Sequence, residues 1–134
     1  MLVGQVTRAD FQQEPYKQWF EEGYNSYVVD TATLDSIGNK DFTMTIVFGT
    51  WCPDSRREVP RMYKILDYLN VPDSNLTVIC VDRDKKAGDI DISSLNIERI
   101  PTFIVYVNGE EKGRIVEKPQ MSLEIDLKNI VDQD

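Results

Sequence analysis

The stretch Gly49-Thr50-Trp51-Cys52-Pro53-Asp54-Ser55 decides the fold of this 134-residue chain, because it joins two strongly patterned segments. The segment before it, Phe42–Phe48, is rich in β-branched and aromatic residues, which is typical of a buried strand. The segment after it predicts an amphipathic helix, with apolar residues at helical spacing: Val59, Met62, Tyr63, Leu66 and Leu69. Asn70 and Pro72 are expected to end this helix. Cys52 therefore lies where a strand passes into a helix.

The second half of the chain predicts further strands and a final helix. Leu76–Val81 is an apolar strand, and strand, helix and strand in this order predict a parallel pair with a right-handed crossover. The polar stretch Asp82–Asp91 is expected to be a solvated loop. Asn108-Gly109 lies between the apolar runs Thr102–Val107 and Gly113–Val116, a strong signal of a β-hairpin. The final helix follows the cap Ser122 and faces inward with Leu123, Leu127, Ile130 and Val131.

The N-terminal part, residues 1–41, is expected to be helical and irregular. Pro15 suits a first helical position, and one helical face carries the aromatic residues Tyr16, Trp19 and Phe20. Such a stripe usually packs against a core and more rarely lines a peptide groove. Thr31 is a candidate cap for a short helix that ends at Ile37. With residues 42–131 as its core, the chain is expected to form one α/β domain over residues 1–134.

The composition argues against several classes of function. The formal net charge is −8, and a surface of that sign repels phosphate backbones and anionic membranes, so neither is an expected partner. No stretch approaches the roughly 18 consecutive apolar residues that a membrane helix needs. The chain has no histidine, which argues against a zinc site and against a hydrolase whose cysteine an imidazole activates. We expect neither a metal nor a cofactor.

The cysteine usage and the first residues bear on the compartment. The two cysteines, Cys52 and Cys80, are too few for a disulfide scaffold. The residues from Met1 to Arg8 lack the basic start and the long apolar region of a signal peptide. Both observations favour the cytoplasm.

Cys52 is the candidate reactive residue. A cysteine at the start of a helix lies close to free N–H groups and to the positive end of the helix dipole, and both favour an anion. We therefore expect Cys52 to carry more thiolate at neutral pH than an ordinary cysteine. The charge of Asp54 opposes the thiolate, whereas Arg56 and Arg57 favour it. The alternative is a plain packed cysteine, which is an unusual occupant of such a corner.

At four places, taken in order, the residues resemble the thioredoxin family. Trp51-Cys52-Pro53-Asp54-Ser55 stands where the family has Trp-Cys-x-x-Cys, and Pro60 matches the proline that kinks the following helix. Ile100-Pro101-Thr102 matches the family's Ile-Pro-Thr, in which the peptide bond before proline is cis. Asn108-Gly109-Glu110 matches the turn into the last strand. The resemblance covers residues 42–131 and implies a thioredoxin fold: a mixed central sheet flanked by helices, here with an N-terminal helical extension.

The resemblance also implies roles for individual residues. Cys52 would be the nucleophile that attacks a disulfide or an oxidised thiol. Pro101 would lie against Cys52, and the backbone at Ile100 would pair with a bound peptide as an added strand. Trp51 would shield the site, next to the further substrate-binding positions Pro53 and Asp54.

The chain departs from the family pattern at three positions. Ser55 replaces the second motif cysteine and cannot resolve a mixed disulfide, because its hydroxyl forms no S–S bond. Ser55 either donates a hydrogen bond to the Cys52 thiolate or simply occupies an early helical position. Ile46 stands in place of a buried acid, and Cys80 in place of a buried lysine. Cys80 is favoured as a small buried hydrophobe, and a backup resolving thiol is the alternative.

Two functions therefore compete. The first is thiol–disulfide exchange through Cys52 alone, with protein disulfides or low-molecular-weight thiols as partners and an external thiol to resolve the mixed disulfide. The second is a binding module that holds an extended peptide beside Pro101, with Cys52 redox-sensing or inactive. A cluster site like that of monothiol glutaredoxins is disfavoured by Pro53 and Trp51.

Overall fold

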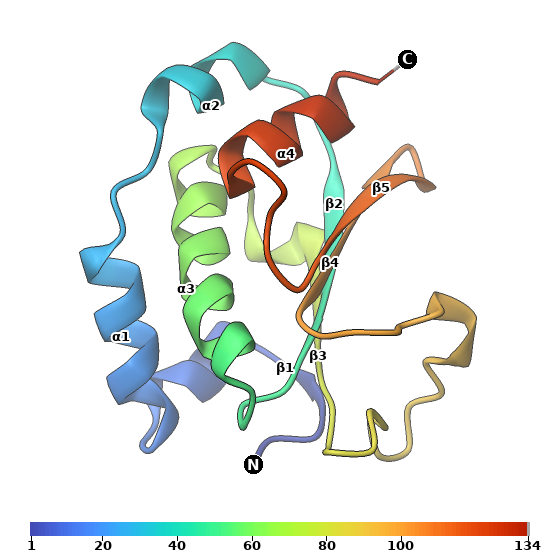
Figure 1. Ribbon diagram of the computed structural model, residues 1–134. Helices are drawn as coiled ribbons and strands as arrows, with labels where there is room; N and C mark the ends of the chain where they lie inside the picture. Colours follow the sequence, from blue (N-terminus) through green and yellow to red (C-terminus); the bar gives the residue numbers. More distant parts are fainter. Residues whose placement is uncertain (134) are drawn as a thin grey trace.

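The computed structural model describes residues 1–133 and is built on one five-stranded mixed sheet (Figure 1). The strand order is β1-β3-β2-β4-β5, in which β2 and β3 are parallel and all other neighbours are antiparallel. The strands span Gly4–Val6 (β1), Thr43–Phe48 (β2), Leu76–Cys80 (β3), Thr102–Val107 (β4) and Glu110–Val116 (β5). The predicted mixed sheet and α/β class are confirmed.

The helices cover one face of this sheet, and an irregular segment covers the other (Figure 1). The helices span Tyr16–Ser26 (α1), Thr31–Ile37 (α2), Pro53–Tyr68 (α3) and Leu123–Val131 (α4). α1 packs on α3, and α2 packs on α4. The opposite face lies under residues 82–100, whose only regular structure is a 3-10 turn at Ser93–Leu95. Among the helices of residues 1–133, none is long and apolar enough to span a membrane.

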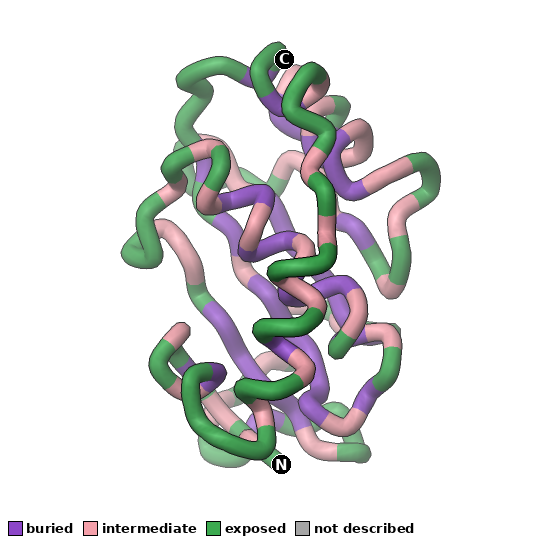
Figure 2. The backbone as a smooth tube through the Cα atoms, turned by 90° about the vertical axis from the view of Figure 1, so that its left-hand side faces the viewer, coloured by how far each residue is buried: buried purple, intermediate pink, exposed green. Residues whose placement is uncertain are grey.

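The two faces have separate hydrophobic clusters. Viewed from the helix side, Figure 2 shows buried residues along the strands and on the inner face of α3. Because side chains alternate along a strand, neighbours on β3 divide between the clusters. Val78 and Cys80 belong to the helix-side cluster, and Ile79 belongs to the loop-side cluster.

The helix-side cluster is built around aromatic rings. Phe11 stacks on Phe20 with ring centres 5.1 Å apart, and it contacts Phe48 and Tyr63 at 5.7 and 5.9 Å. Of the predicted aromatic stripe, Phe20 is buried in this core, whereas Tyr16 and Trp19 are only half-buried. Phe20 is therefore part of the core, and Tyr16 and Trp19 lie at the edge of the core.

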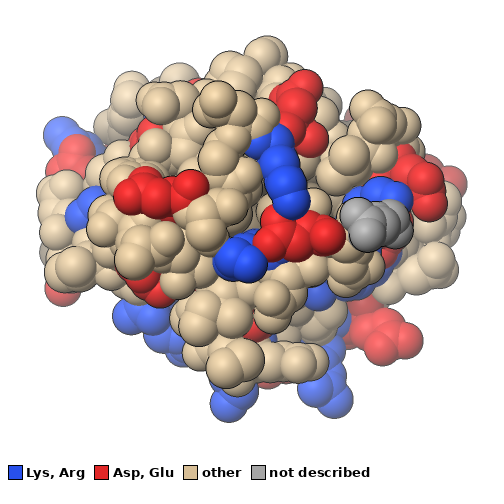
Figure 3. Space-filling view, turned by 90° about the horizontal axis from the view of Figure 1, so that it is seen from above, with Lys and Arg blue, Asp and Glu red and all other residues tan. Residues whose placement is uncertain are grey.

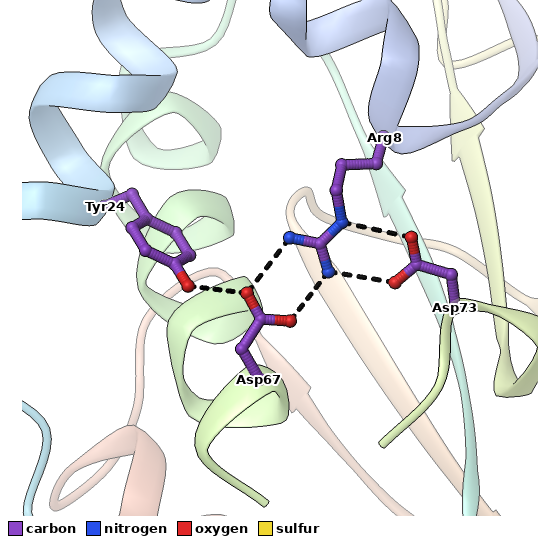
Figure 4. A network of polar contacts seen from close by, with 4 residues as sticks. All are labelled: Arg8, Tyr24, Asp67 and Asp73. Atoms are coloured by element: carbon purple, nitrogen blue, oxygen red, sulfur yellow. Dashed lines mark hydrogen bonds and ion pairs between the residues drawn. The ribbon is translucent and has the colours of Figure 1, made fainter. Parts of the chain in front are cut away.

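Ion pairs fasten the N-terminal segment to the end of α3. The Arg8 guanidinium donates hydrogen bonds to both carboxylate oxygens of Asp67 and of Asp73, at 2.7–3.0 Å (Figure 4). The Tyr24 hydroxyl donates to the same Asp67 at 2.6 Å. Seen from above, Figure 3 shows basic and acidic side chains beside one another rather than a basic patch. Lys128 pairs with Asp132 at the end of α4.

The N-terminal part differs from its predicted helical character. Gly4–Val6 forms β1, which pairs antiparallel with β3 at the sheet edge. A three-residue strand is too short to show a repeating pattern in the sequence. Asp30, not Thr31, caps α2, because its carboxylate accepts the Thr33 N–H. Pro15 precedes α1 as its cap rather than opening it.

The later elements follow the prediction closely. Asn108 and Gly109 both have positive φ (52° and 78°), as a two-residue hairpin turn requires, and β5 begins directly afterwards at Glu110. The Ser122 hydroxyl accepts the Ile125 N–H at 3.0 Å and caps α4, as predicted. The irregular segment after β3 runs on beyond Asp91 to the start of β4.

Candidate functional site

The motif forms a tight corner between β2 and α3. β2 ends at Phe48, and α3 begins at Pro53 with Cys52 as its N-terminal cap. The Cys52 N–H donates to the Gly49 carbonyl at 3.0 Å and closes the turn. A Cβ atom at Gly49 would lie 2.7 Å from the indole of Trp51, so only glycine fits at this position beside that ring. The corner thus fixes where Cys52 stands at the start of the helix.

Cys52 faces the loop before β4. Its Sγ lies 3.9 Å from the Ile100 carbonyl oxygen, within the range of a weak sulfur hydrogen bond. The Ile100-Pro101 peptide bond is cis. Cys52 is 8% exposed and belongs to the loop-side cluster, together with Val47, Ile79, Val81, Ala87 and Ile100. A partner therefore reaches the sulfur only through a small exposed area.

Trp51 connects the motif to the end of β3. Its indole N–H donates to the Val81 carbonyl at 3.0 Å. The Arg83 guanidinium carbon lies 5.0 Å from the centre of the indole, in the geometry of a cation–π contact. The ring is therefore held at one edge by a hydrogen bond and covered by a cation.

The charges that follow Cys52 are only partly compensated. Arg57 pairs with Glu58 at 2.5 Å and with Asp54 at 2.8 Å, and these hydrogen bonds raise the pKa of Arg57. Arg56 instead donates its Nε–H to the Thr50 carbonyl at 2.7 Å and forms no ion pair within residues 1–133. Of the two arginines expected to favour the thiolate, Arg57 is thus neutralised and Arg56 is not. Glu58 is 2% exposed, and its Oε1 has no hydrogen-bond partner in the described chain.

Ser55 holds the corner together from inside. The side chain is fully buried, and its hydroxyl oxygen accepts the Gly49 N–H at 3.3 Å. Within the part of the chain that the structure describes, no hydrogen bond joins Ser55 to Cys52. This contact gives Ser55 a structural role in the corner. A role for Ser55 in the chemistry of Cys52 stays a prediction.

Cys80 lies in the helix-side cluster, apart from the cluster of Cys52. It is fully buried on β3, opposite Phe48 in the register of the parallel pair. Burial, with a smaller contribution from the charge of Asp10, raises the pKa of the Cys80 thiol to about 12. Because only a thiolate attacks a disulfide, these surroundings favour the interpretation of Cys80 as a buried hydrophobe.

A cleft of about 600 Å³ opens beside the motif and was not predicted from the sequence. Thr50, Trp51 and Arg56 form its motif side. The other sides come from the N-terminal part and from the loop after β3: Met1, Pro15, Tyr16, Gln18, Trp19, Glu22 and Arg83. The aromatic stripe was the only signal of it in the sequence, since Tyr16 and Trp19 line the cleft. Nothing local in the sequence connects Arg83 with them.

No metal site accompanies these residues. Within residues 1–133, no three side chains of His, Cys, Asp or Glu gather closely enough to hold a metal ion.

Comparisons with known proteins bear on the fold and on the family. A protein of unknown function from Pseudomonas aeruginosa has 18% identity and a TM-score of 0.62 over 93% of this chain and 82% of its own. A scaffold for an HIV epitope has 16% identity and a TM-score of 0.58 over 95% and 88%. Mitochondrial thioredoxin 3 from Saccharomyces cerevisiae has 22% identity and a TM-score of 0.48 over 80% and 98%. A search of curated proteins found no match.

The match to a family model covers most of the chain. The model of a family described as thioredoxin matches residues 6–128, which include the last residue of β1, the motif corner, the cis proline and most of α4. This span agrees with the five-stranded mixed sheet and the four helices described above. The chain therefore belongs to the thioredoxin family and has the thioredoxin fold.

Proposed function

We propose that this protein exchanges thiols and disulfides through the thiol of Cys52 alone, and that an external thiol completes each cycle. The observation that carries the proposal is the position of Cys52, which caps α3 with its Sγ 3.9 Å from the Ile100 carbonyl, beside the cis peptide bond of Pro101. The free N–H groups of the helix start favour a thiolate there. The thioredoxin family in general supports this class of reaction.

The reaction balances as two thiolate attacks. The Cys52 thiolate attacks one sulfur of a substrate disulfide, a mixed disulfide forms, and the other substrate sulfur leaves as a thiolate that takes a proton from water. An external thiolate then attacks the mixed disulfide and forms a new disulfide with the substrate sulfur. Cys52 is released as a thiolate and is unchanged over the cycle.

An external thiol is needed because neither Ser55 nor Cys80 is suited to resolve the mixed disulfide. Ser55 stands where a second motif cysteine would attack, and a hydroxyl forms no S–S bond. Cys80 is buried in the other hydrophobic cluster, and its raised pKa keeps it protonated at neutral pH. We infer that neither residue resolves the mixed disulfide.

The proposed partners are protein disulfides and low-molecular-weight thiols. An extended peptide beside Pro101 would pair with the backbone at Ile100 as an added strand, which brings its sulfur to Cys52. Trp51, Pro53 and Asp54 border the same corner and are the proposed contacts on the other side.

One observation favours the competing function, a peptide-binding module without redox chemistry. Cys52 is only 8% exposed, less than a nucleophile that must meet a large substrate would be expected to show. The same strand-pairing surface beside Pro101 would serve such a module.

The pH dependence of Cys52 alkylation by iodoacetamide separates the two functions. The measurement uses a Cys80→Ala variant, so that a single thiol reacts, and the same variant unfolded in urea supplies the reference thiol. A midpoint below that of the unfolded reference is expected if the exchange proposal is right.

A double variant, Cys52→Ala with Cys80→Ala, measures the reaction of groups other than thiols. If the folded and unfolded midpoints coincide, or if the folded protein does not react, the exchange proposal is wrong and the binding module is the better account.

A further inference from the structure

The cleft beside the motif is placed to bind part of the same partner that brings a disulfide to Cys52. Its motif side includes Thr50 and Trp51, the residues immediately before Cys52. It shares no lining residue with the Ile100-Pro101 side of the site. The starts of α1 and α3 lie at the same end of the molecule, at the bottom of Figure 1. A chain bound along both surfaces would therefore pass over Cys52.

Two arginines on two tryptophans give the cleft its chemical character. The Arg56 guanidinium carbon lies 5.9 Å from the centre of the Trp19 ring, and that of Arg83 lies 5.0 Å from the centre of Trp51. A guanidinium held against an aromatic ring keeps N–H groups at its edge free to donate. Arg56 uses one of them, its Nε–H, on the Thr50 carbonyl.

Neither arginine has an acidic partner within residues 1–133, although the chain carries a net charge of −8. Arg8, Arg57 and Arg114, by contrast, all form close ion pairs with Asp or Glu. Two unpaired arginines on one cleft of an acidic protein are suited to a carboxylate from outside, which a guanidinium binds with two parallel hydrogen bonds.

The nature of the occupant follows from volume and charge. About 600 Å³ lies within the usual 300–1,000 Å³ of a ligand site and exceeds what one carboxylate needs. Glu22 also lines the cleft, so the charged side chains of the lining balance to a single positive charge. That balance, and the acidic surface elsewhere, disfavour nucleic acid and other polyanions. A short peptide with one or two acidic side chains fits both the volume and the charge of the cleft.

We propose that the cleft bordered by Trp19, Trp51, Arg56 and Arg83 binds an acidic segment of the protein that presents its disulfide to Cys52. This inference deepens the proposed function and rests on it for the disulfide, but not for the binding of the acidic segment. The indole faces contact the peptide chain, and the arginines bind its carboxylates. The cleft thereby selects disulfides that have acidic residues near them.

The first test compares two synthetic peptides in the Cys80→Ala background. Each carries one cysteine as a mixed disulfide with neutral thiopyridine, and two neighbouring residues are Glu in one peptide and Gln in the other. At low salt the Glu peptide is expected to react with Cys52 about tenfold faster, which corresponds to about 1.4 kcal/mol. Arg83→Gln is expected to reduce the ratio of the two rates to within about twofold of one.

The matched control is Arg61→Gln. Arg61 also lies on α3 and covers an aromatic ring, Tyr27, with its guanidinium carbon 5.1 Å from the ring centre, but it does not line the cleft. The rate ratio is expected to survive in this variant. Equal rates for the two peptides in the parent, or a ratio that persists in Arg83→Gln, would overturn the inference while leaving the exchange proposal intact.

A second measurement keeps the inference testable if neither peptide reacts and the exchange proposal fails. The peptides are made with Ser in place of Cys, and their binding is followed by tryptophan fluorescence. Trp19 and Trp51 are the only tryptophans of the chain, and both border the cleft. Saturable binding of the Glu peptide that Arg83→Gln weakens supports the inference, and equal or absent responses to both peptides contradict it.

Discussion

The two faces of the sheet are built differently, although they share the same strands. The helix-side face has stacked aromatic rings, four packed helices and a buried thiol, Cys80. The loop-side face has a smaller cluster of aliphatic residues under an irregular segment, with Cys52 at its margin. The helix-side face therefore supplies most of the buried apolar surface, and the loop-side face holds the corner that carries Cys52.

The largest difference between the faces is expected in stability. Phe11→Ala removes a ring that contacts three other aromatic rings and leaves a cavity, which should lower the free energy of unfolding by about 3–5 kcal/mol. Leu95→Ala, on the half-buried loop side, should cost only about 1 kcal/mol. Urea denaturation of both variants measures the contrast. Equal losses would show that the two clusters stabilise the protein equally.

The second expected difference appears at alkaline pH. Burial raises the pKa of Cys80 to about 12 and also raises the pKa of Tyr63. Burial and the hydrogen bond to Asp67 together raise the pKa of Tyr24 to about 12. These three groups belong to the helix side and hold their protons more tightly when folded. Their contribution to stability is therefore complete below about pH 8, under the ordinary pKa of a thiol, and is lost as the pH rises toward 12.

Denaturation midpoints from about pH 8 to 11 measure this loss, and each group contributes at most about 1.4 kcal/mol per pH unit. Cys80→Ala is expected to make the decline shallower, whereas Cys52→Ala, on the loop side, serves as the matched control for removal of a thiol. A decline that is identical with and without Cys80 would contradict the assignment of this effect to the helix-side core.

The smallest expected difference concerns two arginines that fasten segments on opposite faces. Arg8 binds Asp67 and Asp73 on the helix side, and Arg114 binds Glu111 and the Leu95 carbonyl, which joins β5 to the loop. Arg8→Gln should lower the free energy of unfolding by about 1 kcal/mol, because the pairs are partly exposed. Arg114→Gln should leave it nearly unchanged and instead increase amide hydrogen exchange near Leu95.

The effect of Arg8 should also depend on acid. The Arg8 hydrogen bonds hold the pKa of Asp73 below its ordinary value, so the stability that they add is present above about pH 4 and is lost as the pH falls further. The difference between parent and Arg8→Gln should therefore shrink in acid. If it stays constant as Asp73 becomes protonated, the ion pair is not its source.

The sequence was informative where a pattern repeats or where a turn has its own chemistry. The β-branched and aromatic run Phe42–Phe48 and the helical spacing of α3 are both clear in the sequence. Asn108-Gly109 adopts the positive φ of a hairpin turn, and Ser122 accepts a hydrogen bond from a nearby backbone N–H. β1 was missed because three residues show no period and gain their pairing only from β3. The cap of α2 is Asp30 and not the predicted Thr31, because neighbouring residues compete for the same N–H groups at a helix start.

The site was only half visible from the sequence for a related reason. Residues that follow one another, such as those around Cys52, keep their proximity in any fold. Trp19 and Arg83 approach Trp51 only after α1 has packed on α3 and the chain has left β3, so their meeting has no local signal. The neutralisation of Arg57 by Glu58 is likewise a matter of side-chain geometry rather than of composition.

The close approach of Gly49 to Trp51 has a consequence for how such sequences can diverge. A side chain at position 49 and the indole at position 51 cannot occupy the corner together, so position 49 is expected to change only where the tryptophan at position 51 has been replaced. A lineage that keeps the tryptophan keeps the glycine, and one that trades the tryptophan for a smaller residue becomes free at both positions. A randomised library at positions 49 and 51, selected only for folding, should reproduce that linkage.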